Sequence, residues 1–250
     1  MNLTDQVCLV TGAARRIGRA IALALARRSA RVVVHYHRSS TEAQTTATEC
    51  ARLSGRTAVA LAADQADPAD IERLVAEVEK TLGRIGVLVN NASSLRATPF
   101  LSLTPEQWDA MLDTNLRGPA LFCRAVAPGM LARGSGVMVN IGDAAADPPE
   151  PRFVPYGVAK AGLVALTRGL ALELAPSVRV NAVLPDYVLP PDAPNDVARR
   201  RFEDAAAQRR VATPEDVAAA CLRLIESEEG LTGVVMPVEP DSTGQGDTRK

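Results

Sequence analysis

The chain has 250 residues, a formal net charge of −1, and 28 basic residues against 29 acidic ones. This balance provides no basic face for neutralising phosphates, so nucleic acid is excluded as an expected partner. No apolar run reaches the roughly 20 residues of a membrane span and no targeting segment is visible near residue 1, so we expect no membrane partner and a cytoplasmic location.

Short apolar runs alternate with segments of helical periodicity along the chain. Strand-like runs cover residues 6–12, 31–37, 57–64 and 85–93, and helix-like segments cover 16–28, 39–55, 68–82, 103–115 and 213–227. Thr104 is expected to cap the helix that follows it, with Gln107 completing a capping box, and Gly55 is expected to end the helix before it.

The alternation of strands and helices predicts an α/β fold, a single Rossmann-like doubly wound parallel sheet with helices on both faces. Residues 1–240 are expected to form one domain, because no linker, repeat or low-complexity block interrupts the pattern. The polar, glycine-containing stretch 241–250 is expected to be a flexible tail.

The stretch TGAARRIGRA (11–20) joins the first expected strand to the first helix. A tight turn at Gly12 would let backbone N–H groups at the helix N-terminus face a pyrophosphate. The GxGxxG fingerprint is absent, and Gly12 is followed by Gly18 after five residues. The spacing therefore favours a dinucleotide site but leaves an ordinary glycine turn open.

The stretch HYHRSS (35–40) ends the second expected strand where an NAD site would place an acidic residue. His37, Arg38 and Ser39 are instead suited to a 2′-phosphate, so NADP(H) is favoured over NAD(H). A metal site at His35 and His37 is disfavoured, because no acidic or thiol partner sits beside them and the four cysteines show no paired spacing.

The stretch VNIGDAAADPPEPRFVPYGVAK (139–160) carries Asp143, Tyr156 and Lys160. The last two lie four residues apart, which on a helix places both side chains on one face. An adjacent ammonium is expected to lower the tyrosine pKa from about 10 and make a proton donor near neutral pH. Asp143 is either part of this chemistry or a cap at the end of its strand.

The sequence resembles the short-chain dehydrogenase/reductase family over roughly residues 5–238. The resemblance rests on TGAARRIG, Asp64, VNNAS (89–93), Asn115, YGVAK (156–160) and RVNAVLP (179–185). Within that family it is most similar to the pteridine reductases, which share Arg16 in place of a glycine, the HYHRS segment, NASS, and Asp143 in place of the usual serine.

The resemblance implies catalytic roles for Asn115, Asp143, Tyr156 and Lys160, with Asp143 and Tyr156 as the proton source for a pterin. It implies NADPH contacts from Gly12, Arg16, Ile17, His37, Arg38, Ser39, Asp64, Gln65, Asn91, Ala92, Ser93, Tyr156, Lys160, Pro185 and Val188. It implies substrate contacts from Arg16, Ser93, Leu95, Asp143, Phe153 and Tyr156. It also implies a homotetramer built through the helices at 104–133 and 155–175, and no metal.

Two departures from the pteridine reductases bear on the substrate. Leu95 stands where those enzymes place an aromatic ring against the pterin, and Phe153 could supply an aromatic wall or simply pack in the core. The stretch around 186–210, expected to be a substrate lid, begins at Asp186, where the family usually has glycine.

The sequence thus predicts an NADPH-dependent reductase of a pterin or related heterocycle. A carboxylate at position 143 would repel the alkoxide formed from a ketone and would suit a ring that presents N–H donors. One alternative is an NADPH-dependent reductase of another carbonyl or imine, and the other is a non-catalytic NADP-binding sensor.

Overall fold

The computed structural model describes residues 1–250 except 145–150, 191–195, 208–210, 229 and 239–250. Within these residues, parallel strands form one seven-stranded sheet in the order β3-β2-β1-β4-β5-β6-β7. The strands are β1 (Val7–Val10), β2 (Arg31–Tyr36), β3 (Val59–Ala62), β4 (Ile85–Asn90), β5 (Gly136–Ile141), β6 (Val178–Pro185) and β7 (Val235–Val238).

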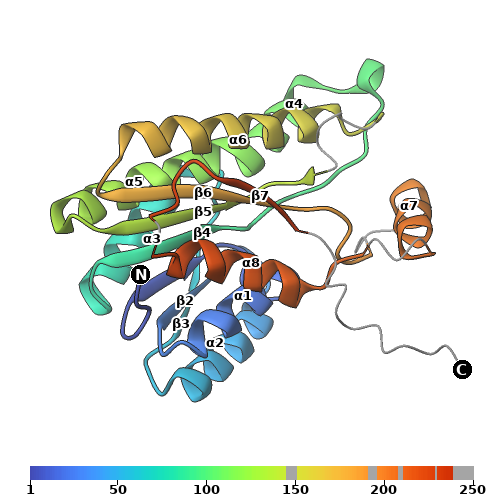
Figure 1. Ribbon diagram of the computed structural model, residues 1–250. Helices are drawn as coiled ribbons and strands as arrows, with labels where there is room; N and C mark the ends of the chain where they lie inside the picture. Colours follow the sequence, from blue (N-terminus) through green and yellow to red (C-terminus); the bar gives the residue numbers. More distant parts are fainter. Residues whose placement is uncertain (145–150, 191–195, 208–210, 229, 239–250) are drawn as a thin grey trace, which may run out of the picture.

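Helices cover both faces of the sheet, which confirms the predicted doubly wound fold (Figure 1). One layer consists of α1 (Arg16–Ala26), α2 (Ser40–Ser54) and α8 (Pro214–Glu226). The opposite layer consists of α3 (Pro68–Thr81), α4 (Pro105–Leu112), α5 (Gly118–Arg133) and α6 (Val154–Glu173). A short 3-10 turn (Phe100–Ser102) precedes α4, and α7 (Asp196–Ala207) lies beyond the end of the sheet.

Each central strand contributes side chains to two hydrophobic cores, because its side chains alternate between the faces of the sheet. Val7 and Leu9 pack in the core beneath α3 and α5, whereas Cys8 and Val10 pack in the core beneath α1 and α8. Both sides are apolar, which is why the strands read as continuous hydrophobic runs rather than as alternating patterns. The four cysteines are buried and unpaired.

The local signals at helix ends are confirmed. Thr104 and Gln107 form a reciprocal capping box at the start of α4, and Gly55 ends α2 with a left-handed φ of 63°. The expected helix 103–115 does not stop there. It continues through a π-helical turn, Asp113–Arg117, directly into α5.

The carboxyl ends of all seven strands meet at one edge of the sheet. β1 pairs with both β2 and β4, so the chain leaves β1 at the point where the strand order reverses. Ligands of such sheets bind outside this switch point. The predicted tail, 241–250, lies outside the described residues, as do 191–195 and 208–210 of the predicted lid.

No helix among the described residues is both long enough and apolar enough to cross a bilayer.

Candidate active site

The first βα turn is locked against the end of β4. Gly12 has a φ of +62°, and a Cβ there would lie 2.8 Å from the Cα of Ala92. A Cβ on Gly18 would lie 2.3 Å from the Gly12 carbonyl oxygen. The Thr11 hydroxyl oxygen accepts hydrogen bonds from the backbone N–H groups of Asn91 and Ala92, each at 2.9 Å. Only glycine fits these two positions, because a Cβ at either would clash with the backbone around it.

His35 supports the same turn from β2. Its Nδ1 accepts the Gly12 N–H at 3.1 Å, its Nε2 lies 3.0 Å from the Ala63 carbonyl oxygen, and its own carbonyl accepts the Ala13 N–H at 3.0 Å. This arrangement requires the neutral imidazole with the proton on Nε2. The ring is 1% exposed, and burial lowers its pKa to about 4.

The residues predicted to meet a 2′-phosphate gather at the carboxyl end of β2. His37 and Arg38 are exposed there, and His37 Nε2 lies 3.7 Å from an Asp64 carboxylate oxygen. The structure therefore brings His37 next to Asp64, and these are two of the residues that would bind the adenosine end of a dinucleotide. In the described part of the chain, no group of three or more His, Cys, Asp or Glu residues could hold a metal ion.

Tyr156 and Asp143 form the centre of the candidate site. The Tyr156 hydroxyl donates a hydrogen bond of 2.6 Å to an Asp143 carboxylate oxygen. Burial and the negative charge of Asp143 raise the pKa of Tyr156 well above 10, and the nearby Ser93 hydroxyl opposes this in part. Tyr156 is therefore a firmly protonated phenol at neutral pH.

The direction of this pKa shift contradicts the expectation that the adjacent ammonium would lower the Tyr156 pKa. The Lys160 Nζ donates instead to the Ile141 carbonyl oxygen at 2.8 Å and lies 5.7 Å from the centroid of the Tyr156 ring. Burial lowers the pKa of Lys160 to about 8, against an opposing effect of Asp143. Burial of the phenol and the carboxylate at position 143 both raise the pKa of Tyr156, and together they decide the sign.

The helix that carries Tyr156 and Lys160 is tied to the sheet by buried amides. Asn140 donates from Nδ2 to the Thr167 hydroxyl on α6 at 2.9 Å, and Asn90 donates from Nδ2 to Asn140 Oδ1 at 2.9 Å. All three side chains are at most 3% exposed. This chain fixes α6 relative to β5, and hence Tyr156 relative to Asp143.

Asn115 occupies the π-helical turn and is 1% exposed. Its Oδ1 accepts the Ser93 hydroxyl at 2.6 Å, and its Nδ2 donates to the Ser94 and Met111 carbonyl oxygens at 3.0 Å each. The side chain of Asn115 is thus consumed in holding the segment after β4.

Two side chains predicted to contact the substrate differ in their exposure to solvent. Leu95 is 53% exposed, whereas Phe153 is 5% exposed and packs inward. The two loops that carry them are joined by the Thr98 N–H, which donates to the Arg152 carbonyl oxygen at 2.7 Å. Leu95 is therefore available to cover a ring, and Phe153 in this conformation is largely covered.

Arg16 joins the first βα turn to the start of the predicted lid. It adopts a φ of +55° and donates from its guanidinium to the Pro190 carbonyl oxygen at 2.9 Å. Pro185 ends β6, and Val188 is 7% exposed and packs in the core on the α1 side. These contacts place the chain after β6 over the candidate site.

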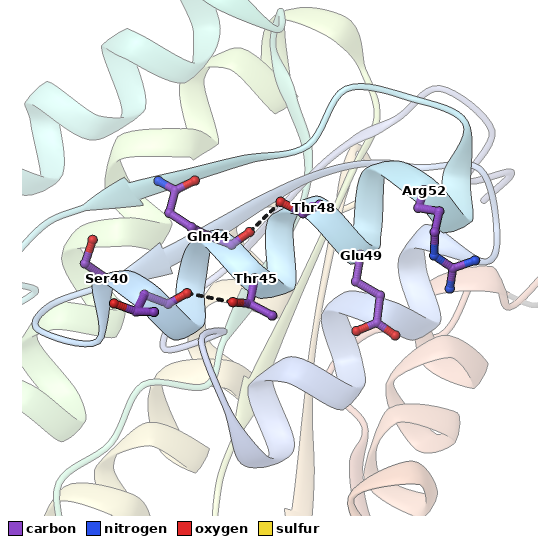
Figure 2. Close-up of a pocket in the computed structure, with 7 residues that line it drawn as sticks. Ser40, Gln44, Thr45, Thr48, Glu49 and Arg52 are labelled. Carbon is purple, nitrogen blue, oxygen red and sulfur yellow. Dashed lines mark hydrogen bonds between the residues drawn. The ribbon is translucent and has the colours of Figure 1, made fainter.

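A separate shallow hollow lies on the outer surface of α2 (Figure 2). Two of its polar side chains make local hydrogen bonds: Thr45 and Thr48 donate to the carbonyl oxygens of Thr41 and Gln44 at 2.9 Å each. It contains none of the predicted catalytic residues. The candidate active site is therefore the strand edge rather than this hollow.

The buried neutral state of His35 makes folding sensitive to acid. The folded pKa of about 4 lies below the unfolded value of 6.5, so the unfolded chain binds more protons between these pH values. The stability that His35 contributes is complete above pH 6.5 and is lost as the pH falls towards 4. His37, Asp64 and Asp70 are the charged groups that act on the ring.

We expect the free energy of unfolding to fall between pH 6.5 and 4 by roughly 3 kcal/mol more in the wild type than in His35→Asn, whose Oδ1 can still accept the Gly12 N–H without titrating. Urea unfolding followed by circular dichroism at several pH values measures this. His37→Asn is the matched control, because that side chain is exposed. Equal acid sensitivity of wild type and His35→Asn would contradict the assignment.

The comparisons with known proteins agree with this geometry. Residues 6–200 match the family described as short chain dehydrogenase. The 3-oxoacyl-[acyl-carrier-protein] reductase of Synechocystis sp. is 42% identical over 187 residues, 74% of this chain and 75% of that one. Oxidoreductase UcpA of Escherichia coli K12 is 35% identical over 259 residues, 97% of this chain and 96% of the relative.

The crystal structure of a protein from Sinorhizobium meliloti 1021, provisionally named a short-chain alcohol dehydrogenase, superimposes on this structure with a TM-score of 0.86. That protein is 31% identical, and the superposition covers 95% of this chain and 96% of the other. With the family match over residues 6–200, the switch-point turn and the Tyr156–Lys160 pair on α6, the chain belongs to the short-chain dehydrogenase family of nicotinamide-dependent oxidoreductases.

Proposed function

We propose that this oxidoreductase is an NADPH-dependent reductase of a pterin or related nitrogen heterocycle. The observation that carries the proposal is the 2.6 Å hydrogen bond from the Tyr156 hydroxyl to the Asp143 carboxylate. A neutral hydroxyl at position 143 would leave Tyr156 free to donate to a ketone oxygen. A carboxylate there attracts an N–H donor and repels a developing alkoxide.

The proposed cofactor is NADPH. The Gly12 and Gly18 cradle would hold the pyrophosphate, and Arg38 at the exposed end of β2 would hold the 2′-phosphate. NADPH supplies the hydride when bound, and the protein positions the ring and the proton. Lys160, with a pKa of about 8, is largely an ammonium at neutral pH and can donate to the nicotinamide ribose.

The proton route follows from the Asp143–Tyr156 pair. An N–H group of the substrate would take the place of the Tyr156 hydroxyl at the carboxylate. The released hydroxyl would then donate to the substrate atom that gains negative charge. Asp143 thereby serves as the switch between a resting phenol and a donating one.

One relative favours a second candidate, an NADPH-dependent reductase of a carbonyl or imine compound. The Synechocystis protein is named a 3-oxoacyl reductase and is 42% identical over the matched residues. The two candidates differ in what Asp143 must accept, so a substrate panel separates them. Binding of NADPH without turnover of any compound would favour the non-catalytic sensor instead.

Self-assembly through α4, α5 and α6 is part of the proposal. Leu131, Val158 and Leu172 are 44%, 42% and 84% exposed on α5 and α6, which supports a homotetramer that covers them.

The substrate class is tested by following NADPH oxidation with dihydrobiopterin and dihydrofolate against a panel of ketones and quinones. We expect turnover of the pterins by the wild type, and a loss of about 100-fold or more in Asp143→Ala, because the N–H acceptor is removed. Asp143→Ser is the matched variant and is expected to gain ketone activity. Turnover of ketones alone by the wild type would establish the second candidate.

Replacing Tyr156 with Phe separates the proton donor from cofactor binding. We expect kcat to fall by about a hundred- to ten-thousand-fold, because the general acid is lost, while the Kd of NADPH stays within about three-fold. Stopped-flow turnover and fluorescence titration measure the two quantities. Loss of NADPH binding would show that Tyr156 holds the cofactor rather than the proton.

The cofactor preference is tested by Arg38→Asp. We expect NADPH to bind about ten- to a hundred-fold more weakly, because a charge-assisted bond to the 2′-phosphate becomes a repulsion, while NADH binding changes little. Isothermal titration with both cofactors measures the ratio. An equal effect on NADPH and NADH would place Arg38 away from the 2′-phosphate.

A further inference from the structure

Gln65 is a buried amide at a position where the family resemblance implies a cofactor contact. It follows β3 beside Asp64, and it is 5% exposed. Its Nε2 donates to the Thr114 carbonyl oxygen at 2.5 Å and to the Ala92 carbonyl oxygen at 3.2 Å. The side chain is therefore directed into the protein, towards the π-helical turn and the segment that follows β4.

The two carbonyls lie directly before two residues of the candidate site. Ala92 precedes Ser93, and Thr114 precedes Asn115. The Ser93 hydroxyl donates to Asn115 Oδ1 at 2.6 Å. One amide group of Gln65 and one side-chain bond thus join the same pair of segments at adjacent positions, and neither segment can move without stretching one of these bonds.

The backbone of Gln65 is packed tightly against the start of α5. A Cβ on Gly118 would lie 2.6 Å from the Gln65 carbonyl oxygen and 3.2 Å from its Cβ. Gly118 follows the π-helical turn that carries Asn115. The close approach fixes where the amide of Gln65 stands relative to that turn.

The oxygen end of the Gln65 amide accepts no hydrogen bond within the described part of the chain, so the N–H end is the part that binds. Gln65 Oε1 is buried and has no hydrogen-bond partner among the residues that the structure describes. A buried polar atom without a partner costs stability, and an aliphatic side chain of similar size would avoid the cost. What glutamine adds over leucine at this place is two N–H donors for two carbonyls.

We propose that Gln65 is a positioning residue for the reduction, an amide clamp that sets Ser93 and Asn115 beside Tyr156 instead of binding the cofactor through its side chain. The proposal rests on the proposed reductase function but not on the identity of the substrate. It predicts that Gln65 governs the rate of turnover more than the affinity for NADPH. It also predicts that its loss loosens the π-helical turn in the absence of any ligand.

The test compares Gln65→Leu with Gln44→Leu, the same substitution on the exposed face of α2, where Figure 2 shows Gln44. We expect kcat in Gln65→Leu to fall about ten- to a hundred-fold at saturating NADPH, with the Kd of NADPH within about two-fold of wild type. Amide hydrogen exchange of residues 111–117, measured without substrate, should be faster than in the Gln44→Leu control.

A weaker Kd with unchanged kcat and unchanged exchange would overturn the proposal and make Gln65 a cofactor contact. Wild-type values of all three quantities would overturn it as well. Because the Kd and hydrogen-exchange measurements need no turnover, they test whether Gln65 acts as a clamp even if no pterin is reduced. Failure of the proposed substrate is then seen separately, as silence of the wild type.

Gln65→Glu provides the second variant, which keeps the shape and replaces the donor by a titratable group. The ionised carboxylate would face two carbonyl oxygens and repel them, whereas the protonated acid can donate to one of them. We expect the ratio of variant to wild-type kcat to rise as the pH falls from 8 to 5.5. A ratio that does not change with pH would contradict the clamp.

Discussion

All seven strands run in the same direction, and this constraint decides where the residues of the candidate site can lie. The carboxyl ends of β1 to β7 meet at a single edge, so the glycine turn after β1, the HYHRSS stretch at the end of β2 and Asp143 after β5 lie along the same edge although the sequence separates them. Both faces of the sheet are buried under helices, so this edge is the part of the sheet left for chemistry.

Two kinds of structural feature hold the site at that edge in place, glycines at close contacts and buried amides. Glycines remove side chains where the chain must approach itself, at Gly12 against Ala92 and at Gly118 against Gln65. Buried amides then fix the distances, from Asn90 through Asn140 to Thr167 on one side of Tyr156, and from Gln65 to the Ser93 and Asn115 segments on another. In such a frame the short contact between Tyr156 and Asp143 is a property of the scaffold, and a substrate that competes for the carboxylate meets a preorganised acceptor.

The sequence predicted the parts that depend on local pattern. Apolar runs gave the strands, and the Thr104 capping box and Gly55 marked helix ends, because these signals lie within a few residues. The π-helical turn at 113–117 was missed, because its residues carry an ordinary helical pattern and differ only in how the turn closes. The inward direction of Gln65 was missed too, since a polar residue after a strand looks the same whether it faces a ligand or a carbonyl. The sign of the Tyr156 pKa shift needed the burial of the phenol and its contact with Asp143, and no spacing in the sequence supplies either.

The π-helical turn has a consequence for how this scaffold can change over evolution. Such a turn holds one residue more than the α-helical turn it replaces, and each residue rotates a helix by about 100°. Deleting one residue between Asp113 and Arg117 would let the turn close as an ordinary α-helical one, because the wider turn already absorbs the extra residue. The face of α5 that meets the sheet would then keep its direction. What would change is the backbone around Asn115, so a surplus residue of this kind alters the local shape of one turn and leaves the frame around it in place.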